Sequence, residues 1–285
     1  MKKRKIQKNS FVFGISFGIP LGMILCLIIF AGLLLIPNIK PQPLKNNYDN
    51  SFQSLYFREQ NFESSIEVGK INPKKIPIVM YHYVEYITDK NDTMRVKMNT
   101  NPYFFERQLS SLNNNHSKTY FVRDVPDILN NTINYSSDSA ILTFDDGYAD
   151  FYNVVYPLLK KYQIKATVYV INNYIGRFGF LNEAQIKEML NSGLVELGAH
   201  TLDHLYLKTI SDKVAIDQVV ESKKKLEKQF GVTVATFAYP YGAFNKQTVE
   251  IVRDAGFVAA VSVIPGTVQS IDNIYYMYRI RPGSL

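Results

Sequence analysis

Two adjacent aspartates and two histidines four positions apart are the residues of this sequence best suited to chemistry. Asp145 and Asp146 end an apolar run in LTFDDGY, residues 142–148, and the histidines His200 and His204 lie in GAHTLDH. Two imidazole nitrogens and one carboxylate oxygen would form a three-ligand metal site with room for water, as catalytic zinc sites do. The second aspartate could then remove a proton from that water. The structural alternatives are a β-turn at the Asp-Gly pair and two unrelated histidines.

Two further segments could contribute to the same chemistry. FAYPYG, residues 237–242, reads as a strand that runs into a proline-containing turn. Such a turn is either structural or aims a backbone N–H at developing negative charge, as an oxyanion hole requires. His82 follows an apolar run in IVMYHYV, residues 78–84, whereas His116 lies in the polar stretch NNNHSK and is expected in a solvated loop.

The candidate segments follow predicted strands. Short apolar, β-branched runs predict strands at residues 76–81, 139–144, 165–171, 194–200, 235–240, 257–263 and 275–280. Helical spacing predicts helices near residues 104–112, 154–159, 182–193, 211–230 and 245–255. This alternation is typical of parallel strands with helices outside, in a barrel or a large open sheet. In both architectures functional side chains gather at the carboxyl ends of strands, which is where all four segments fall.

The composition is that of a foldable protein with one large domain and attachments. Of the 285 residues, 46% are hydrophobic and 20% are charged. The formal charge is +7, but five lysine and arginine residues lie within the first ten positions, which leaves +2 for the rest. Because no stripe of basic and aromatic residues is present, this pattern argues against nucleic-acid binding. Cys26 is the only cysteine, so a disulfide within the chain is excluded.

The N-terminal residues are expected to hold the domain at a membrane. A basic tail, residues 1–10, precedes 26 uncharged positions, residues 11–36, more than the roughly 20 that cross a bilayer as a helix. The positive-inside rule places the tail in the cytoplasm and the remainder outside the cell. A cleaved signal peptide, followed by secretion, is the alternative. Residues 37–75, rich in Pro and Asn, are expected to form a linker to a domain over residues 76–285.

Together these motifs resemble those of the polysaccharide deacetylase family, carbohydrate esterase family 4, which is built on the NodB homology domain. The family motif T-F-D-D-G is complete at residues 143–147, and H-[ST]-x-x-H is complete at residues 200–204. The third motif, R-x-P-[YF], is present with Ala238 in the place of arginine. The resemblance covers residues 76–285 and implies a distorted (β/α) barrel that hydrolyses the acetamide of N-acetylated sugars with a divalent metal.

The same resemblance implies roles for individual residues. Asp145 corresponds to the catalytic base, and the Tyr241 N–H corresponds to the oxyanion donor. Asp146, His200 and His204 correspond to the metal ligands. Zinc suits two imidazoles and one carboxylate, and cobalt, nickel and iron are alternatives.

The sequence also departs from the family pattern. The family usually ends with a Leu-x-His whose histidine is the general acid, yet no histidine follows His204. In this the chain is similar to the branch that acts on poly-β-1,6-N-acetylglucosamine, the intercellular adhesin polymer, where an N-terminal Tyr-His supplies the acid. That resemblance implies His82 as the acid. The fourth motif has no match because the chain lacks tryptophan, and Arg279 or Arg281 could supply the missing third-motif guanidinium.

The sequence therefore predicts a membrane-anchored, extracellular, metal-dependent N-deacetylase of a cell-surface N-acetylglucosamine polymer. A peptidoglycan deacetylase uses the same chemistry and is the first alternative. A polysaccharide-binding module without activity is the second, although binding alone needs no base beside a metal. A metal-dependent phosphoesterase is the third, but such sites commonly use two metals and more ligands than this chain offers. The sequence does not identify a protein partner.

Overall fold

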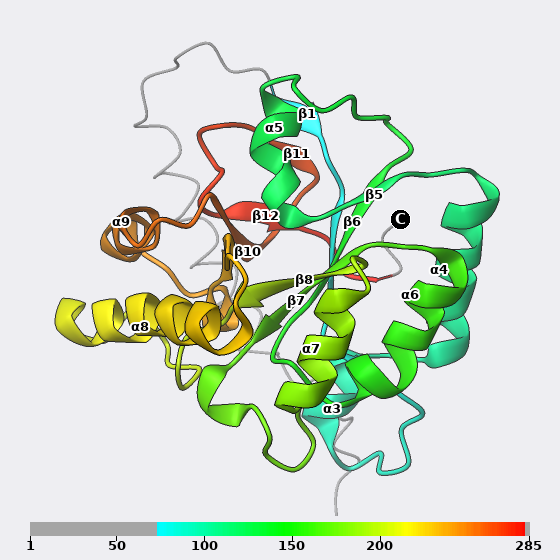
Figure 1. Ribbon diagram of the computed structural model, residues 1–285, viewed down its shortest axis with the longest axis horizontal. Helices are drawn as coiled ribbons and strands as arrows, with labels where there is room; N and C mark the ends of the chain where they lie inside the picture. The colour runs from blue at the N-terminus through cyan, green and yellow to red at the C-terminus, as the bar shows by residue number, and fades with distance from the viewer. Residues whose placement is uncertain (1–72, 283–285) are drawn as a thin grey trace, which may run out of the picture. The chain divides into compact units, whose positions relative to one another are not determined.

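Seven runs of buried residues form the parallel strands of a nearly closed barrel in the computed structural model, which describes residues 73–282 (Figure 1). In order around the barrel these strands are β12 (Met277–Arg279), β10 (Ala259–Pro265), β9 (Thr236–Ala238), β8 (Val195–Ala199), β7 (Ala166–Val170), β6 (Ala140–Phe144) and β2 (Ile78–Tyr81). Ile280, just after β12, bonds through its backbone to Ile78 and Met80, which brings the last strand back to the first. Each strand overlaps one predicted region, so the prediction of seven strands is confirmed, and a barrel rather than an open sheet is formed.

Several two-residue strands add to this frame and were not predicted. The pairs are β5 (Thr119–Tyr120) with the start of β6, β1 (Lys74–Lys75) with β11 (Val268–Gln269), and β3 (Tyr83–Val84) with β4 (Asn99–Thr100). Two residues are too few to produce a recognisable hydrophobic period. Because β1 falls in the last residues of the expected linker, the folded part begins slightly before residue 76.

The five predicted helices are present outside the barrel. They are α4 (Pro102–Asn114), α6 (Tyr156–Tyr162), α7 (Glu183–Asn191), α8 (Asp212–Phe230) and α9 (Lys246–Asp254). A capping box begins α7, with the side chains of Asn182 and Gln185 each accepting a bond from the other's backbone N–H. Shorter elements complete the fold: α3 (Thr93–Met98), α5 (Val125–Leu129), η1 (Val122–Asp124), η2 (Phe151–Val155), η3 (Asn172–Tyr174) and η4 (Pro240–Gly242). Figure 1 shows α5, β1 and β11 together at one end of the barrel.

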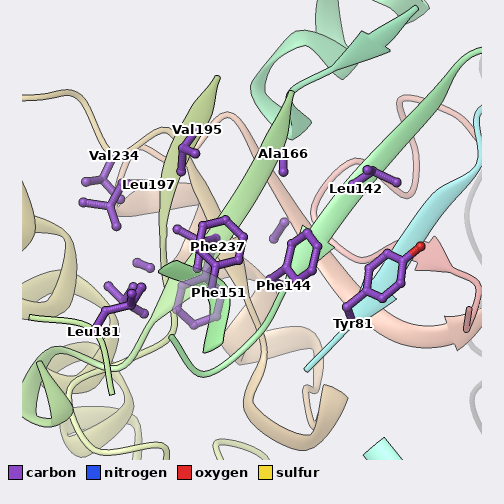
Figure 2. Close-up of a cluster of buried hydrophobic side chains, with 14 of the residues drawn as sticks. Tyr81, Leu142, Phe144, Phe151, Ala166, Leu181, Val195, Leu197, Val234 and Phe237 are labelled. Atoms are coloured by element: carbon purple, nitrogen blue, oxygen red, sulfur yellow. The ribbon is translucent and has the colours of Figure 1, made fainter. Parts of the chain in front are cut away.

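The barrel strands are buried on both faces. Side chains that point outward, such as Leu142 and Phe144, pack with the helices in one apolar cluster (Figure 2). Alternate residues, such as Ile141 and Tyr169, belong to a second apolar cluster that fills the inside. This double burial explains why the strands read as continuous apolar runs rather than alternating ones.

No helix within residues 73–282 is long and apolar enough to cross a membrane. The basic tail, the expected membrane helix at residues 11–36 and nearly all of the expected linker lie outside the described residues.

Candidate active site

The three metal-ligand candidates lie together at the carboxyl ends of two strands. Asp146 follows β6, and the two histidines, His200 and His204, follow β8. One ligand atom of each residue lies within 4.8 Å of the others. Asp146 Oδ1 is 3.3 Å from Nε2 of His200 and 3.2 Å from Nε2 of His204. The parallel arrangement has thus brought side chains from distant segments to one point.

The backbone at this cluster is held in unusual conformations. Asp146, Thr201 and His204 have φ values of 72°, 66° and 60°, in the left-handed region that non-glycine residues rarely adopt. The His204 N–H donates to Thr201 Oγ1 at 2.9 Å, which fixes the turn between the two histidines. Strained residues of this kind persist only where the surrounding structure holds them, and they concentrate at functional sites.

The chemistry of the donor atoms fits a divalent metal. His200 Nδ1 is 2.7 Å from the Ala238 carbonyl oxygen, so Nδ1 carries the proton and Nε2 presents its lone pair to the cluster. Asp146 Oδ1 is buried and has no hydrogen-bond partner among residues 73–282. A buried carboxylate oxygen without a partner is costly, and a cation at this point would satisfy it. These three side chains could therefore hold a divalent metal ion.

Asp145 is oriented separately from the metal-ligand candidates. Its carboxylate is 3% exposed and accepts two parallel bonds from Arg279, at 2.8 Å from Nη1 and 2.7 Å from Nη2. The guanidinium is itself held by Thr143 Oγ1 at 3.1 Å and by the Ser262 carbonyl at 2.7 Å. Burial alone would raise the pKa of Asp145, but the Arg279 charge and bonds bring that pKa below its ordinary value. The carboxylate is therefore ionised at neutral pH and available to accept a proton.

The two arginines that could replace the missing third-motif guanidinium have different positions. Arg279 points into the barrel from β12 and is 1% exposed, whereas Arg281 is exposed. Only Arg279 bonds to Asp145 among these two. The sequence could not distinguish them, because residues two apart in a strand share one face. The choice depends on where the strand ends: β12 ends at Arg279, and Arg281 lies beyond it.

His82 lies at the end of β2, the strand next to β6. Its Nε2 is 3.9 Å from Asp145 Oδ2, and its side chain is 20% exposed. Burial lowers the pKa of His82, and the nearby charges of Asp145 and Asp146 oppose that effect. The imidazole is thus placed beside the candidate base and within reach of a group bound at the cluster.

Tyr241 lies on a turn that packs against the metal-ligand candidates. Its φ is 60°, and its ring centroid is 4.5 Å from that of His204. Gly242, also at a positive φ of 65°, lies so close to β10 that an added Cβ would be 2.3 Å from Val263 Cγ2. The turn is therefore held closely against β10, and the ring of Tyr241 lies against that of His204.

Two residues near the site were not singled out from the sequence. Tyr148 stacks on Tyr83 with ring centroids 3.9 Å apart, and its phenol interacts with Asp146. Asp150 accepts a bond from the Val84 N–H and so holds the segment that follows His82. Burial raises the pKa of Asp150 to about 6. Tyr148 adjoins the T-F-D-D-G motif, but neither residue forms a spacing pattern that indicates these contacts. His116 is exposed in a loop, as expected.

Comparison with known proteins groups this chain with deacetylases. The family described as "Polysaccharide deacetylase" matches residues 132–260. The solved structure of Streptococcus pyogenes deacetylase PplD, in complex with acetate, is 33% identical with a TM-score of 0.67, covering 74% of this chain and 93% of that one. YxkH of Bacillus subtilis, provisionally named a polysaccharide deacetylase, is 28% identical over 246 residues, or 86% of this chain and 85% of the relative. The Staphylococcus aureus poly-β-1,6-N-acetyl-D-glucosamine N-deacetylase is 33% identical over 155 residues, or 50% of this chain and 53% of the relative.

Proposed function

The chain belongs to the polysaccharide deacetylase family of metal-dependent hydrolases, and on that premise we propose that it removes acetyl groups from a polymer of N-acetylglucosamine. The substrate that we propose is poly-β-1,6-N-acetyl-D-glucosamine, a biofilm exopolysaccharide. Its deacetylation would create cationic amines that bind the polymer to an anionic cell envelope.

The observation that carries this proposal is that two neighbouring carboxylates have different partners. Asp146 joins two imidazoles in a cluster that could hold a divalent ion. Asp145, the preceding residue, is kept ionised by Arg279 and faces His82 rather than joining that cluster. A base placed beside a metal site serves hydrolysis, whereas sugar binding alone would not require it.

The residues of the site supply a base and an acid for the reaction. When bound, a divalent ion, of which zinc is our first choice, would polarise the attacking water and the amide carbonyl. Asp145 accepts a proton from the water while the water oxygen bonds to the acetyl carbon. The carbonyl oxygen then gains negative charge, and the Tyr241 N–H donates a hydrogen bond to that oxygen. His82 protonates the sugar nitrogen as the C–N bond breaks, so the products are a free amine and acetic acid. The acid loses its proton to solvent as acetate, and proton exchange restores Asp145 and His82.

Two observations support the β-1,6 polymer as substrate. A relative named for that activity is 33% identical over about half of this chain. The chain also has no histidine after His204, and the imidazole closest to Asp145 outside the metal-ligand candidates is that of His82. An acid on the first barrel strand is what the resemblance to that branch of the family implies.

The site of action that we propose is the outer face of the cell membrane. Residues 11–36 carry no charge and follow a basic tail, which supports a single membrane-spanning anchor with the catalytic domain outside. Secretion after cleavage is the alternative. Fractionation of cells that express the full chain distinguishes the two, since an anchored chain stays with membranes through a high-salt wash.

The direct test is acetate release by the purified full-length chain. Oligomers of β-1,6-linked N-acetylglucosamine and peptidoglycan fragments are offered separately, with Asp145→Asn as the matched control that keeps the metal-ligand set intact. We expect release from the β-1,6 oligomers, and none above background from Asp145→Asn. Release from peptidoglycan alone would replace the substrate, and tight binding of oligomers without release would indicate a binding module.

A further inference from the structure

Phe178 is a fully exposed phenylalanine on a turn of the loop that follows β7. Its relative exposure is 104%, higher than that of any other exposed large apolar residue within residues 73–282. It lies between Gly176 and Gly179, whose φ values of 81° and 85° allow the chain to reverse sharply on both sides of it. An exposed apolar residue alone means little, so the inference depends on how this one is held.

The turn that carries Phe178 is braced against the metal-ligand segment. Backbone bonds run from Gly176 N–H to the Leu181 carbonyl at 2.8 Å and from Leu181 N–H to the Gly147 carbonyl at 2.9 Å. A third bond runs from Ala149 N–H to the Gly179 carbonyl at 2.9 Å. Gly147 directly follows Asp146, so the turn is fixed to the same stretch of chain that supplies the carboxylate ligand.

Aromatic contacts add a second brace. The Phe180 ring lies 5.1 Å from that of Tyr148 and 5.0 Å from that of Tyr174. Tyr148 in turn interacts with Asp146. Phe178, two positions before Phe180, is therefore on a turn that these backbone bonds and ring contacts hold in place.

A second group of exposed aromatic rings lies near the metal-ligand candidates, on the loops after β8 and β9. Tyr241 lies 4.5 Å from His204 and is 60% exposed, and Tyr206 lies 6.0 Å from Tyr241 and is 40% exposed. The metal-ligand candidates thus have exposed aromatic rings on the loops after β7, β8 and β9. Aromatic faces offer large apolar contact area to the C–H faces of sugar rings, whose hydroxyl groups stay in water.

We infer that Phe178 and Tyr206 are stacking contacts for the sugars on either side of the reacting one, so that the enzyme acts within a glycan chain rather than on single sugars. This inference rests on the proposed function, because a polymer bound at the metal-ligand candidates must continue over the surrounding rim. Within residues 73–282 the Phe178 side chain is left uncovered, and a sugar next to the reacting one in the same glycan is the partner that we assign to it.

The test is the dependence of kcat/KM on chain length in the full-length protein. β-1,6-linked N-acetylglucosamine oligomers from the disaccharide to the hexasaccharide serve as substrates for wild type, Phe178→Ala and Phe178→Trp. We expect kcat/KM to rise with length in wild type. Phe178→Ala should reduce that rise by about five- to tenfold through a higher KM, because this factor corresponds to the free energy of one aromatic stacking contact. Phe178→Trp restores the rise, because a larger ring offers the same contact.

The control is Phe104→Ala, which removes an exposed phenylalanine from α4, 60% exposed and outside this rim. It should leave the length dependence as in wild type. The inference fails if Phe178→Ala retains the wild-type length dependence, or if it instead changes membrane attachment or oligomeric state. If wild type releases no acetate from any oligomer, the proposed function itself has failed, so the two failures are distinguishable.

Discussion

At the scale of single residues, Arg279 determines the protonation of the proposed base. It forms a bidentate pair with Asp145 inside the barrel and takes its other contacts from Thr143 and Ser262. Lysine keeps the charge but offers a point donor in place of the planar fork. The pair therefore depends on shape as well as charge.

Arg279→Lys should lower kcat by about 10- to 100-fold while metal content stays that of wild type. Because lysine would lose the bidentate bonds that offset the effect of burial, the pKa of Asp145 should rise. Since Asp145 must be ionised to act as a base, the acidic limb of the pH profile of kcat/KM should move to higher pH. An acidic limb at the wild-type position would show that Arg279 does not set this ionisation.

His82 is tested by a substrate that needs no acid. Loss of a general acid costs about 100-fold or more with a poor leaving group such as a sugar amine. The rate of acetate release by His82→Ala should therefore fall by that factor on an oligosaccharide. It should fall by far less on an acetanilide with an electron-withdrawing ring, because the amine of that substrate leaves without a proton. Asp145→Asn should lose activity on both substrates, and an equal loss for His82→Ala on both would contradict the acid role.

At the scale of elements, the barrel could be predicted because its strands are short, apolar and separated by helices. That the residues after four of these strands, including His82, Asp145, His200 and Tyr241, lie near one another could be predicted, because parallel strands end at one edge. The partner of Asp145 could not be chosen, because Arg279 and Arg281 share one strand parity and the point at which β12 ends is set by its pairing with strands distant in sequence. The two-residue strands could not be predicted because two residues are too few to show a hydrophobic period.

The opposite end of the barrel contains a buried glutamate on β8. Glu196 is 1% exposed and accepts bonds from the Val122 N–H at 3.1 Å and from Thr167 Oγ1 at 2.6 Å. Burial raises the pKa of Glu196 from 4.5 to about 7, despite these donors. Between those two pH values the folded state binds more protons than the unfolded state, so stability falls as pH rises through this window.

Glu196→Gln should remove that dependence. The raised pKa corresponds to about 3 kcal/mol of lost stability above pH 7. Urea unfolding at pH 5 and pH 8 should show a smaller loss between the two for Glu196→Gln than for wild type, with exposed Glu188→Gln as the charge-matched control. Equal pH dependence in all three proteins would mean that Glu196 is not titrated by unfolding.

At the scale of the whole domain, a bound metal would act as a cross-link between separate parts of the barrel. Asp146 comes from the loop after β6, and His200 and His204 come from the loop after β8, with β7 between them. The barrel itself is closed between β12 and β2 by a short bridge. A ligand that binds only the folded state raises stability by mass action, by about 2.7 kcal/mol at a concentration 100 times its Kd.

Removal of the metal should therefore lower the melting temperature of the full-length chain by about 5–10 °C, given the usual relation between free energy and Tm for a domain of this size. Calorimetry with and without a chelator measures the shift, and addition of zinc, cobalt or nickel to the stripped protein ranks the ions. Asp145→Asn should show the wild-type shift, because its carboxylate is not among the ligand candidates, whereas His204→Ala should show almost none. If a chelator lowered the melting temperature of His204→Ala as much as that of wild type, the ion would bind elsewhere. The roles assigned to both aspartates would then lose their basis.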